Sequence, residues 1–153
     1  MSIEARLSTL NITLPDAPAP AANYVPFVRT DNLLFVSGQI SAGPQGLIRG
    51  RLGDDLDVAA GAAAARACGL SLLAQARAAL GSLDQVARVV KLTGFVNSTP
   101  DFTDQPEVIN GCSDLMVEVF GDKGRHARAA VSAAALPRGV AVEVEAVFEI
   151  AAG

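Results

Sequence analysis

The chain has 153 residues, half of them hydrophobic and 18% charged, with a formal net charge of -4. This length suits one domain with a substantial core, and the apolar content excludes a disordered chain. The 12 basic residues are scattered without a run, so the sequence disfavours binding to nucleic acid. Because Trp is absent and aromatic residues are few, the core must be built from Ala, Val and Leu.

No targeting or metal-binding signal stands out. The N-terminus has mixed charge and lacks the apolar core of a signal peptide, and no uncharged apolar stretch of about 18 residues predicts a membrane helix. We therefore expect a cytoplasmic protein. Cys68 and Cys112 lack ligand spacing and a nearby histidine, which favours two small buried side chains over a metal site. We expect neither a metal nor a cofactor.

The first part of the chain divides at residue 22. Residues 2–10 have the periodicity of a short amphipathic helix, and three prolines within residues 14–20 predict an extended arm. We assign residues 1–22 to this helix and arm and residues 23–153 to the main domain. There, residues 24–29 predict an edge strand interrupted by Pro26.

The apolar run at residues 33–37 predicts a central strand covered on both faces, and it would form a hairpin with the edge strand. Residues 40–50 are rich in glycine and predict a second, weaker hairpin.

Two helices and three further strands follow. Asp57 predicts an N-cap for a helix over residues 58–80 that ends at Gly81, and its glycines at 61 and 69 should permit close packing on a sheet. A second helix should begin near Thr103 or Asp104 and run to Phe120. The strands are expected within residues 86–96, 126–132 and 140–147.

This order of elements predicts an α+β fold, a mixed β-sheet with two helices packed on one face. The second face would expose Val and Ala side chains, so we expect a symmetric oligomer to cover it.

Arg128 is a lone arginine among alanines and valines in a predicted strand. A guanidinium there keeps its charge, so it needs an anionic partner or a bound anion, and its planar fork suits a carboxylate. An ion pair with Glu143 or Glu145 across the strands is the alternative. His126, the one histidine, excludes a two-histidine metal site within one chain; it is either a pH-sensitive neighbour of Arg128 or an ordinary strand-end residue.

Four sequence blocks, in order and at matching spacings, carry a family resemblance. They are residues 23–26 (Asn-Tyr-Val-Pro), 34–39 (Leu-Phe-Val-Ser-Gly-Gln), 91–96 (Lys-Leu-Thr-Gly-Phe-Val) and 127–145, the two final strands with their Leu-Pro turn. Through them the chain resembles the RidA/YjgF family of reactive-intermediate deaminases. The resemblance implies a chorismate-mutase-like fold and a homotrimer with its sheets facing inward. It also implies clefts between subunits where enamines and imines from amino-acid metabolism are hydrolysed to keto acids and ammonia.

The resemblance also assigns site residues. Arg128 matches the arginine that holds the substrate carboxylate, and Glu143 matches the glutamate that positions or activates water. The substrate-binding matches are Tyr24, Ser37, Gly38 and Asn110. The segment before Asn110 is longer than in typical active members, Ala130 stands where cysteine is common, and the N-terminal helix and arm are additional. These departures resemble a longer branch of the family.

Three functions are therefore weighed. A metal-free deaminase of small imino or enamino acids is the first. The second is a trimer that binds a small carboxylate without turning it over. Ribonuclease activity, the third, is disfavoured by the negative net charge and the absence of a second histidine.

Overall fold

The computed structural model describes residues 1–20 and 22–152. Its main sheet has five strands in the order β1-β2-β7-β5-β6. Their bounds are β1 Phe27–Thr30, β2 Leu33–Ile40, β5 Val86–Asn97, β6 Ala127–Ala133 and β7 Val142–Ile150. β5 and β6 are parallel and the other neighbours are antiparallel, so the sheet is mixed as predicted.

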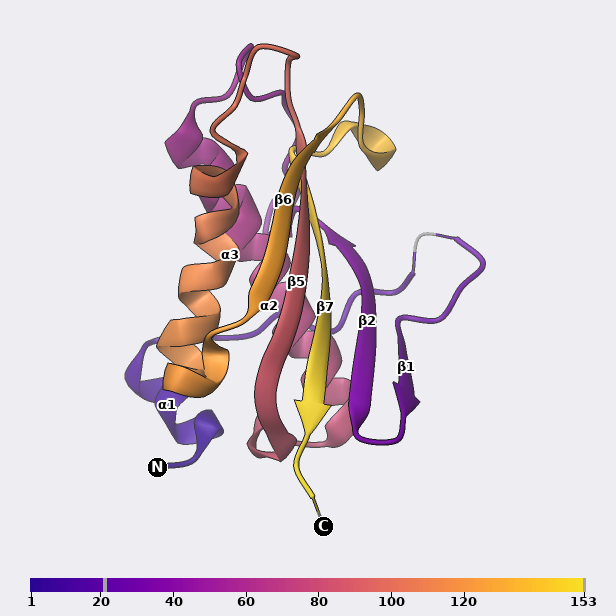
Figure 1. Cartoon of the computed structure of the whole chain (residues 1–153), viewed down its shortest axis with the longest axis vertical. Coiled ribbons are helices and arrows are strands. Elements are labelled where there is room, and N and C mark those ends of the chain that lie inside the picture. The colour runs from indigo at the N-terminus through magenta and orange to yellow at the C-terminus, as the bar shows by residue number, and fades with distance from the viewer. Residues whose placement is uncertain (21, 153) are drawn as a thin grey trace.

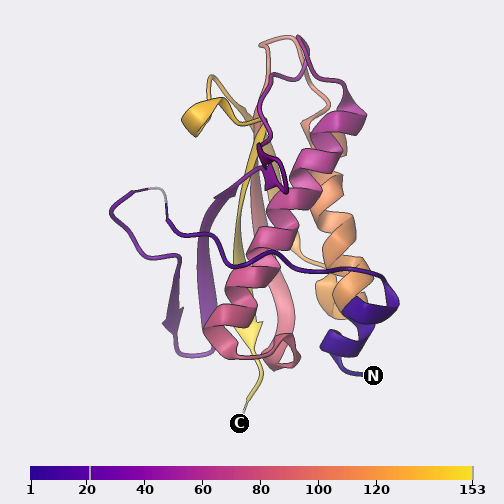
Figure 2. The same ribbon diagram turned by 180° about the vertical axis from the view of Figure 1, so that it is seen from behind.

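Helices cover one face of this sheet (Figures 1 and 2). α2 (Val58–Leu80) and α3 (Gln105–Phe120) lie side by side on it, and the short α1 (Ile3–Thr9) packs against the end of α3. The prediction of two covering helices is confirmed, and α1 adds a third through Leu7, which is buried. Smaller elements are the hairpin β3 (Ala42–Gly43) and β4 (Gly46–Leu47), and the 3-10 turns η1 (Leu83–Gln85), η2 (Gly121–Gly124) and η3 (Pro137–Gly139).

The ends of α2 follow the predicted signals. The Asp57 carboxylate accepts a hydrogen bond of 2.8 Å from the Ala60 amide, which satisfies a donor that the first turn leaves free. Gly81 ends the helix with φ of 84°, a conformation that glycine adopts without strain. At α3, by contrast, the Asp104 side chain makes no capping bond.

Two strand predictions near the N-terminus need correction. Strand β1 begins at Phe27, so Tyr24 and Pro26 precede the strand instead of lying within it. The run at residues 33–37 is not covered on both faces within one chain, because Leu34 and Val36 are buried while Phe35 is 44% exposed. Its contiguous apolar residues hid the alternation that a sheet with one uncovered face imposes.

The uncovered face of the sheet carries several apolar side chains. Exposed Val28 and Phe35 are cross-strand partners, and exposed Val131 pairs with Phe95. Exposed apolar groups gathered on one face are typical of a protein–protein contact.

The helices approach each other closely because glycines line their contact. The sequence predicted that Gly61 and Gly69 would permit packing on the sheet. Instead they lie against α3, where a Cβ would meet Val108 at Gly61 and Leu115 at Gly69. On α3 itself, a Cβ at Gly111 would overlap the carbonyl oxygen of Ala62 in α2.

Gly111→Ala should therefore destabilise the fold. The new methyl group meets helix backbone that cannot rotate away, so we expect a loss of about 2 kcal/mol in the free energy of unfolding. Urea denaturation measures it. Asp114→Ala, at an exposed position of the same helix, is the control and should stay within about 0.5 kcal/mol of the wild type. Equal stability of the two variants would contradict the close contact between α2 and α3.

Helix α2 is long and apolar enough to cross a membrane by length and composition. Here it is a core helix, with Ala64, Ala65, Leu72 and Leu73 fully buried. The extended arm runs across it (Figure 2), anchored by buried Leu14. The arm thus packs on the main domain.

Candidate functional site

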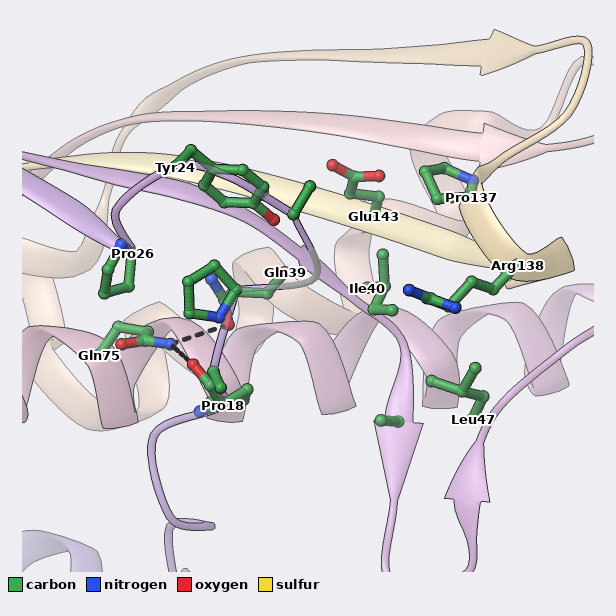
Figure 3. Close-up of a pocket in the computed structure, with 15 residues that line it drawn as sticks. Pro18, Tyr24, Pro26, Gln39, Ile40, Leu47, Gln75, Pro137, Arg138 and Glu143 are labelled. Atoms are coloured by element: carbon green, nitrogen blue, oxygen red, sulfur yellow. Dashed lines mark hydrogen bonds between the residues drawn. The ribbon is translucent and has the colours of Figure 1, made fainter.

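A cavity of about 680 Å³ opens beside the second half of β2, where the pairing with β7 shifts register between Val36 and Gln39 (Figure 3). Most of its lining is apolar. The lining residues are Pro18, Ala19, Pro20, Ala22, Tyr24, Pro26, Gly38, Gln39, Ile40, Ala42, Leu47, Gln75, Pro137, Arg138 and Glu143. Three of the predicted site residues, Tyr24, Gly38 and Glu143, therefore meet in one cavity, which we call the Glu143 cavity.

Glu143 occupies this cavity because of strand alternation. Its neighbours Val142 and Val144 point into the core, so Glu143 points to the opposite face of β7. Its carboxylate lies over Gly38, where any side chain would collide with it. Burial raises the pKa of Glu143, and the negative charge of Glu145, two residues along on the same face, raises it further.

Glu145→Gln should lower the pKa of Glu143, because ionisation then no longer adds a second negative charge to this face. Carbon NMR of the Glu143 carboxyl across a pH series measures it. Glu149→Gln, six residues away on the same strand, is the control and should leave the midpoint unchanged. An unchanged midpoint in Glu145→Gln would contradict the coupling.

The raised pKa also has a consequence for stability. The folded chain holds the Glu143 proton more tightly than the unfolded chain, so this group stabilises the fold below its ordinary pKa of 4.5. That contribution is lost as the pH rises through the raised value.

Tyr24 and Ser37 differ in how free they are. Tyr24 is 46% exposed, and its ring borders the Glu143 cavity (Figure 3). Ser37 donates its hydroxyl hydrogen to the Val25 carbonyl at 2.8 Å and is not among the residues that line the cavity. Its hydroxyl thus fixes the backbone that carries Tyr24, as expected of a strand serine satisfied by backbone.

Sequence reasoning missed two features of the cavity. Gln75 of α2 is 1% exposed and donates to the Pro18 carbonyl at 2.6 Å and to the Gln39 side chain at 3.4 Å. Gln39 in turn donates to the Ser37 carbonyl at 2.9 Å, so a line of amides ties the arm to β2. The one available signal was an isolated glutamine among the alanines and leucines of α2.

Arg138 also lines the cavity, from a backbone with φ of 60°. Its guanidinium points toward Ile40 and Leu47 (Figure 3). It lies in the predicted turn between the last two strands, which sequence reasoning treated only as a connection.

Arg128 lies elsewhere, on the edge strand β6. It pairs with buried Leu92, so its side chain points toward the helices and reaches α3. Nη1 donates to Asn110 Oδ1 at 2.9 Å and to Ser113 Oγ at 3.0 Å, and Nη2 donates to the Pro106 carbonyl at 3.2 Å. The structure thus brings together Arg128 and Asn110. They meet even though the segment before Asn110 is longer than in typical active members of the family.

The expectation for Arg128 was an anionic partner or a bound anion, and these contacts correct its first half, because no anionic side chain of the described residues bonds with Arg128. Within residues 1–20 and 22–152, the ion pairs are Arg66–Glu118, Arg77–Glu4 and Arg125–Asp122, so the alternative pairing of Arg128 with Glu143 or Glu145 is wrong. Neutral oxygens hold the guanidinium and use three of its five N–H donors. In the part of the chain that the structure describes, the Nε–H and one Nη2–H make no hydrogen bond, which leaves two donors for a ligand carboxylate.

His126 is a close neighbour of this group. It precedes β6 instead of lying in it, and its ring contacts Ser113 through Nε2 at 2.8 Å and the Gly124 carbonyl through Nδ1 at 2.6 Å. Burial lowers the pKa of His126; the bond to Gly124 opposes this, and the charge of Arg128 adds to it. His126 thus lies at the end of β6, as the second interpretation from sequence held, and is joined to Arg128 through Ser113, so the contacts fit both interpretations.

Cys68 and Cys112 are free thiols, and both are buried as predicted. Burial raises the pKa of Cys112 to about 12, and burial also raises that of Cys68. Both are therefore thiols at neutral pH, unsuited to nucleophilic attack. Among the described residues, no group of three or more His, Cys, Asp and Glu side chains is placed to hold a metal ion.

The mixed sheet with one helical layer, the Glu143 cavity and the oxygen-held arginine define a small α+β domain with a ligand-sized cavity beside β2. The family model described as Endoribonuclease L-PSP matches residues 14–150. The chain belongs to this family, which is that of RidA and YjgF.

Individual relatives place the chain within the family. Protein TCP17 of Trypanosoma cruzi is 53% identical over 150 residues, covering 97% of this chain and 94% of TCP17. The crystal structure of Atu1372 from Agrobacterium tumefaciens, a protein of unknown function, superposes with a TM-score of 0.89 at 49% identity, covering 97% of this chain and 92% of the other. RidA from an Antarctic Psychrobacter is more distant, with a TM-score of 0.62, 28% identity and coverage of 88% and 94%. Almost the whole chain, including its N-terminal additions, is thus shared with Atu1372.

Proposed function

We propose that the protein is a homotrimeric, cytoplasmic deaminase that hydrolyses small imino or enamino acids to keto acids and ammonia, without a resident metal or cofactor. The observation that carries the proposal is that a member of the RidA family presents an oxygen-held arginine, Arg128, at its β6 edge and a carboxylate, Glu143, in a cavity beside β2.

The two halves of the site would meet between subunits. Arg128 and Asn110 lie at the β6 edge of the sheet, whereas Glu143 and Gly38 lie across it on β7 and β2. β5 separates β6 from β7, and Arg128 points to the helical face while Glu143 points to the other. One chain therefore cannot present both groups to one small molecule. A β6 edge set against the Glu143 cavity of the next copy would unite them.

The uncovered sheet face supports assembly. Val28, Phe35 and Val131 expose apolar surface there, and their burial against identical faces would stabilise a trimer by the hydrophobic effect. The resulting cleft would exclude bulk water and strengthen the interactions of charged groups within it.

Each residue would have a distinct role. The free N–H donors of Arg128 hold the substrate carboxylate and leave the imine carbon beside Glu143. The Glu143 carboxylate accepts a proton from water as the water oxygen attacks that carbon, and Tyr24 borders the substrate. The proton passes from Glu143 to the imine nitrogen, which completes the carbinolamine and restores the carboxylate. When the C–N bond of the carbinolamine breaks, its hydroxyl proton moves to the nitrogen, ammonia leaves and the carbonyl of the keto acid forms. Because Glu143 must be ionised, its raised pKa shifts the acid limb of the rate profile upward.

The decisive experiment generates imines in situ with an amino-acid oxidase and follows their hydrolysis with and without the protein. We expect the protein to speed the loss of imine and the release of ammonia. Light scattering should show that the active protein is a trimer. A well-folded trimer that binds keto acids such as pyruvate without turnover would favour a carboxylate-binding module instead. A monomer would contradict the composite site.

A further inference from the structure

His126 and Ser113 are the strongest unassigned feature of the molecule. They lie outside the Glu143 cavity, and with Arg128 and Asn110 they form one hydrogen-bonded group, the Arg128 cluster. The same depression in the surface is bordered by Asp114 and Val117 of α3 and by Arg125. The cluster joins α3 to the first residues of β6.

The chemistry of the groups in the Arg128 cluster fixes which atom donates and which accepts in each hydrogen bond. The Gly124 carbonyl can only accept, so His126 Nδ1 must carry a hydrogen. In the neutral ring Nε2 is then an acceptor, and it takes the hydroxyl hydrogen of Ser113 at 2.8 Å. With that hydrogen engaged, Ser113 Oγ turns a lone pair toward Arg128 Nη1, which donates to it at 3.0 Å.

We propose that His126 and Ser113 are positioning residues for carboxylate binding, which hold the Arg128 guanidinium in the orientation that presents its free donors to the ligand. This inference rests on the proposed function of Arg128. The lowered pKa of His126 agrees with a neutral ring that accepts from Ser113 at physiological pH.

Loss of Ser113 should act on binding and leave the chemical step intact. Without Oγ, Arg128 keeps its bonds to Asn110 and Pro106, but one Nη1 hydrogen loses its partner and the fork can rotate. We expect the Kd for pyruvate and the KM for imines to rise about 10-fold in Ser113→Ala with kcat unchanged, because the carboxylate is held equally before and during reaction. His126→Phe removes the acceptor and should raise both about 3-fold.

Matched variants separate positioning from general damage. Ser113→Thr keeps the hydroxyl and should restore the Kd to within about twofold. Ser132→Ala removes a serine from β6 whose hydroxyl bonds with Ser98 and not with Arg128, and it should bind as the wild type. Thermal melting and light scattering check that each variant keeps its fold and assembly.

Nitrogen NMR of the His126 ring tests the orientation independently of ligand. The wild type should show the tautomer protonated at Nδ1, and the opposite tautomer would overturn the inference. A Kd unchanged in Ser113→Ala, with pyruvate bound normally by the wild type, would overturn it while leaving the proposed function standing. No keto-acid binding by a well-folded wild-type trimer would overturn the proposed function, and this inference with it.

Discussion

Arg128→Ala is expected to weaken pyruvate binding by at least about 100-fold, since it removes two charge-assisted hydrogen bonds worth together about 3 kcal/mol. Calorimetric titration measures the Kd. Imine hydrolysis should fall with binding, because the substrate carboxylate would no longer hold the imine carbon beside Glu143.

The fold should survive this change. Arg128 lies at the sheet edge and bonds to neutral oxygens, so no buried carboxylate is left without a partner. Arg66→Ala is the matched control: it removes a partly exposed arginine of α2 whose ion pair is with Glu118 and which lies outside the depression beside Arg128. Arg128→Lys keeps the charge without the planar fork and should bind between the wild type and alanine. Pyruvate bound as tightly by Arg128→Ala as by the wild type would refute the assignment.

Glu143→Gln is expected to lower kcat by about 10²- to 10⁴-fold, the usual contribution of a positioned general base. Glutamine has nearly the same shape but cannot accept a proton from water, so the pyruvate Kd should stay within about twofold. Steady-state turnover assays measure kcat, and calorimetric titration of the same preparation measures the pyruvate Kd.

Glu145→Gln is the control, since it changes the same group on the same strand face. At a pH above the titration of Glu143 it should turn over at the wild-type rate. Its acid limb should lie at lower pH, because the pKa of Glu143 falls when the neighbouring charge is removed. Loss of both binding and turnover in Glu143→Gln would point to a structural role, since Glu143 lies over Gly38.

Most elements of the fold could be predicted because their signals are local. Asp57 and Gly81 mark the two ends of α2 through bonds and dihedral angles within a few residues. The alternation of valine and glutamate in β7 is enough to predict that Glu143 and Glu145 share one face of the strand. The prediction of a strand at Tyr24 is wrong for a nonlocal reason, because pairing with β2 begins only at Phe27.

The candidate site was predictable only in part. Arg128 could be singled out because a guanidinium among alanines needs partners for its charge, but the expected anionic partner within the chain is wrong, and neutral oxygens hold it instead. Which oxygens hold Arg128 depends on α3, whose Pro106, Asn110 and Ser113 lie 15 to 22 residues earlier in the chain. The same dependence hid Ser113, whose neighbours in sequence give no hint of the His126 ring.

By itself the sequence determined the α+β class, the ends of the long helix, the face of Glu143 and the need of the Arg128 charge for a partner, because each follows from dihedral preferences, strand alternation or desolvation of a charge. Only the tertiary structure decided that Gln75 ties the arm to the Glu143 cavity and that Ser113 links His126 to Arg128. It also placed β5 between the strands of Arg128 and Glu143 and set the two side chains on opposite faces of the sheet. These are contacts between distant segments, and the order of strands in the sheet, which no local pattern encodes, sets which segments meet.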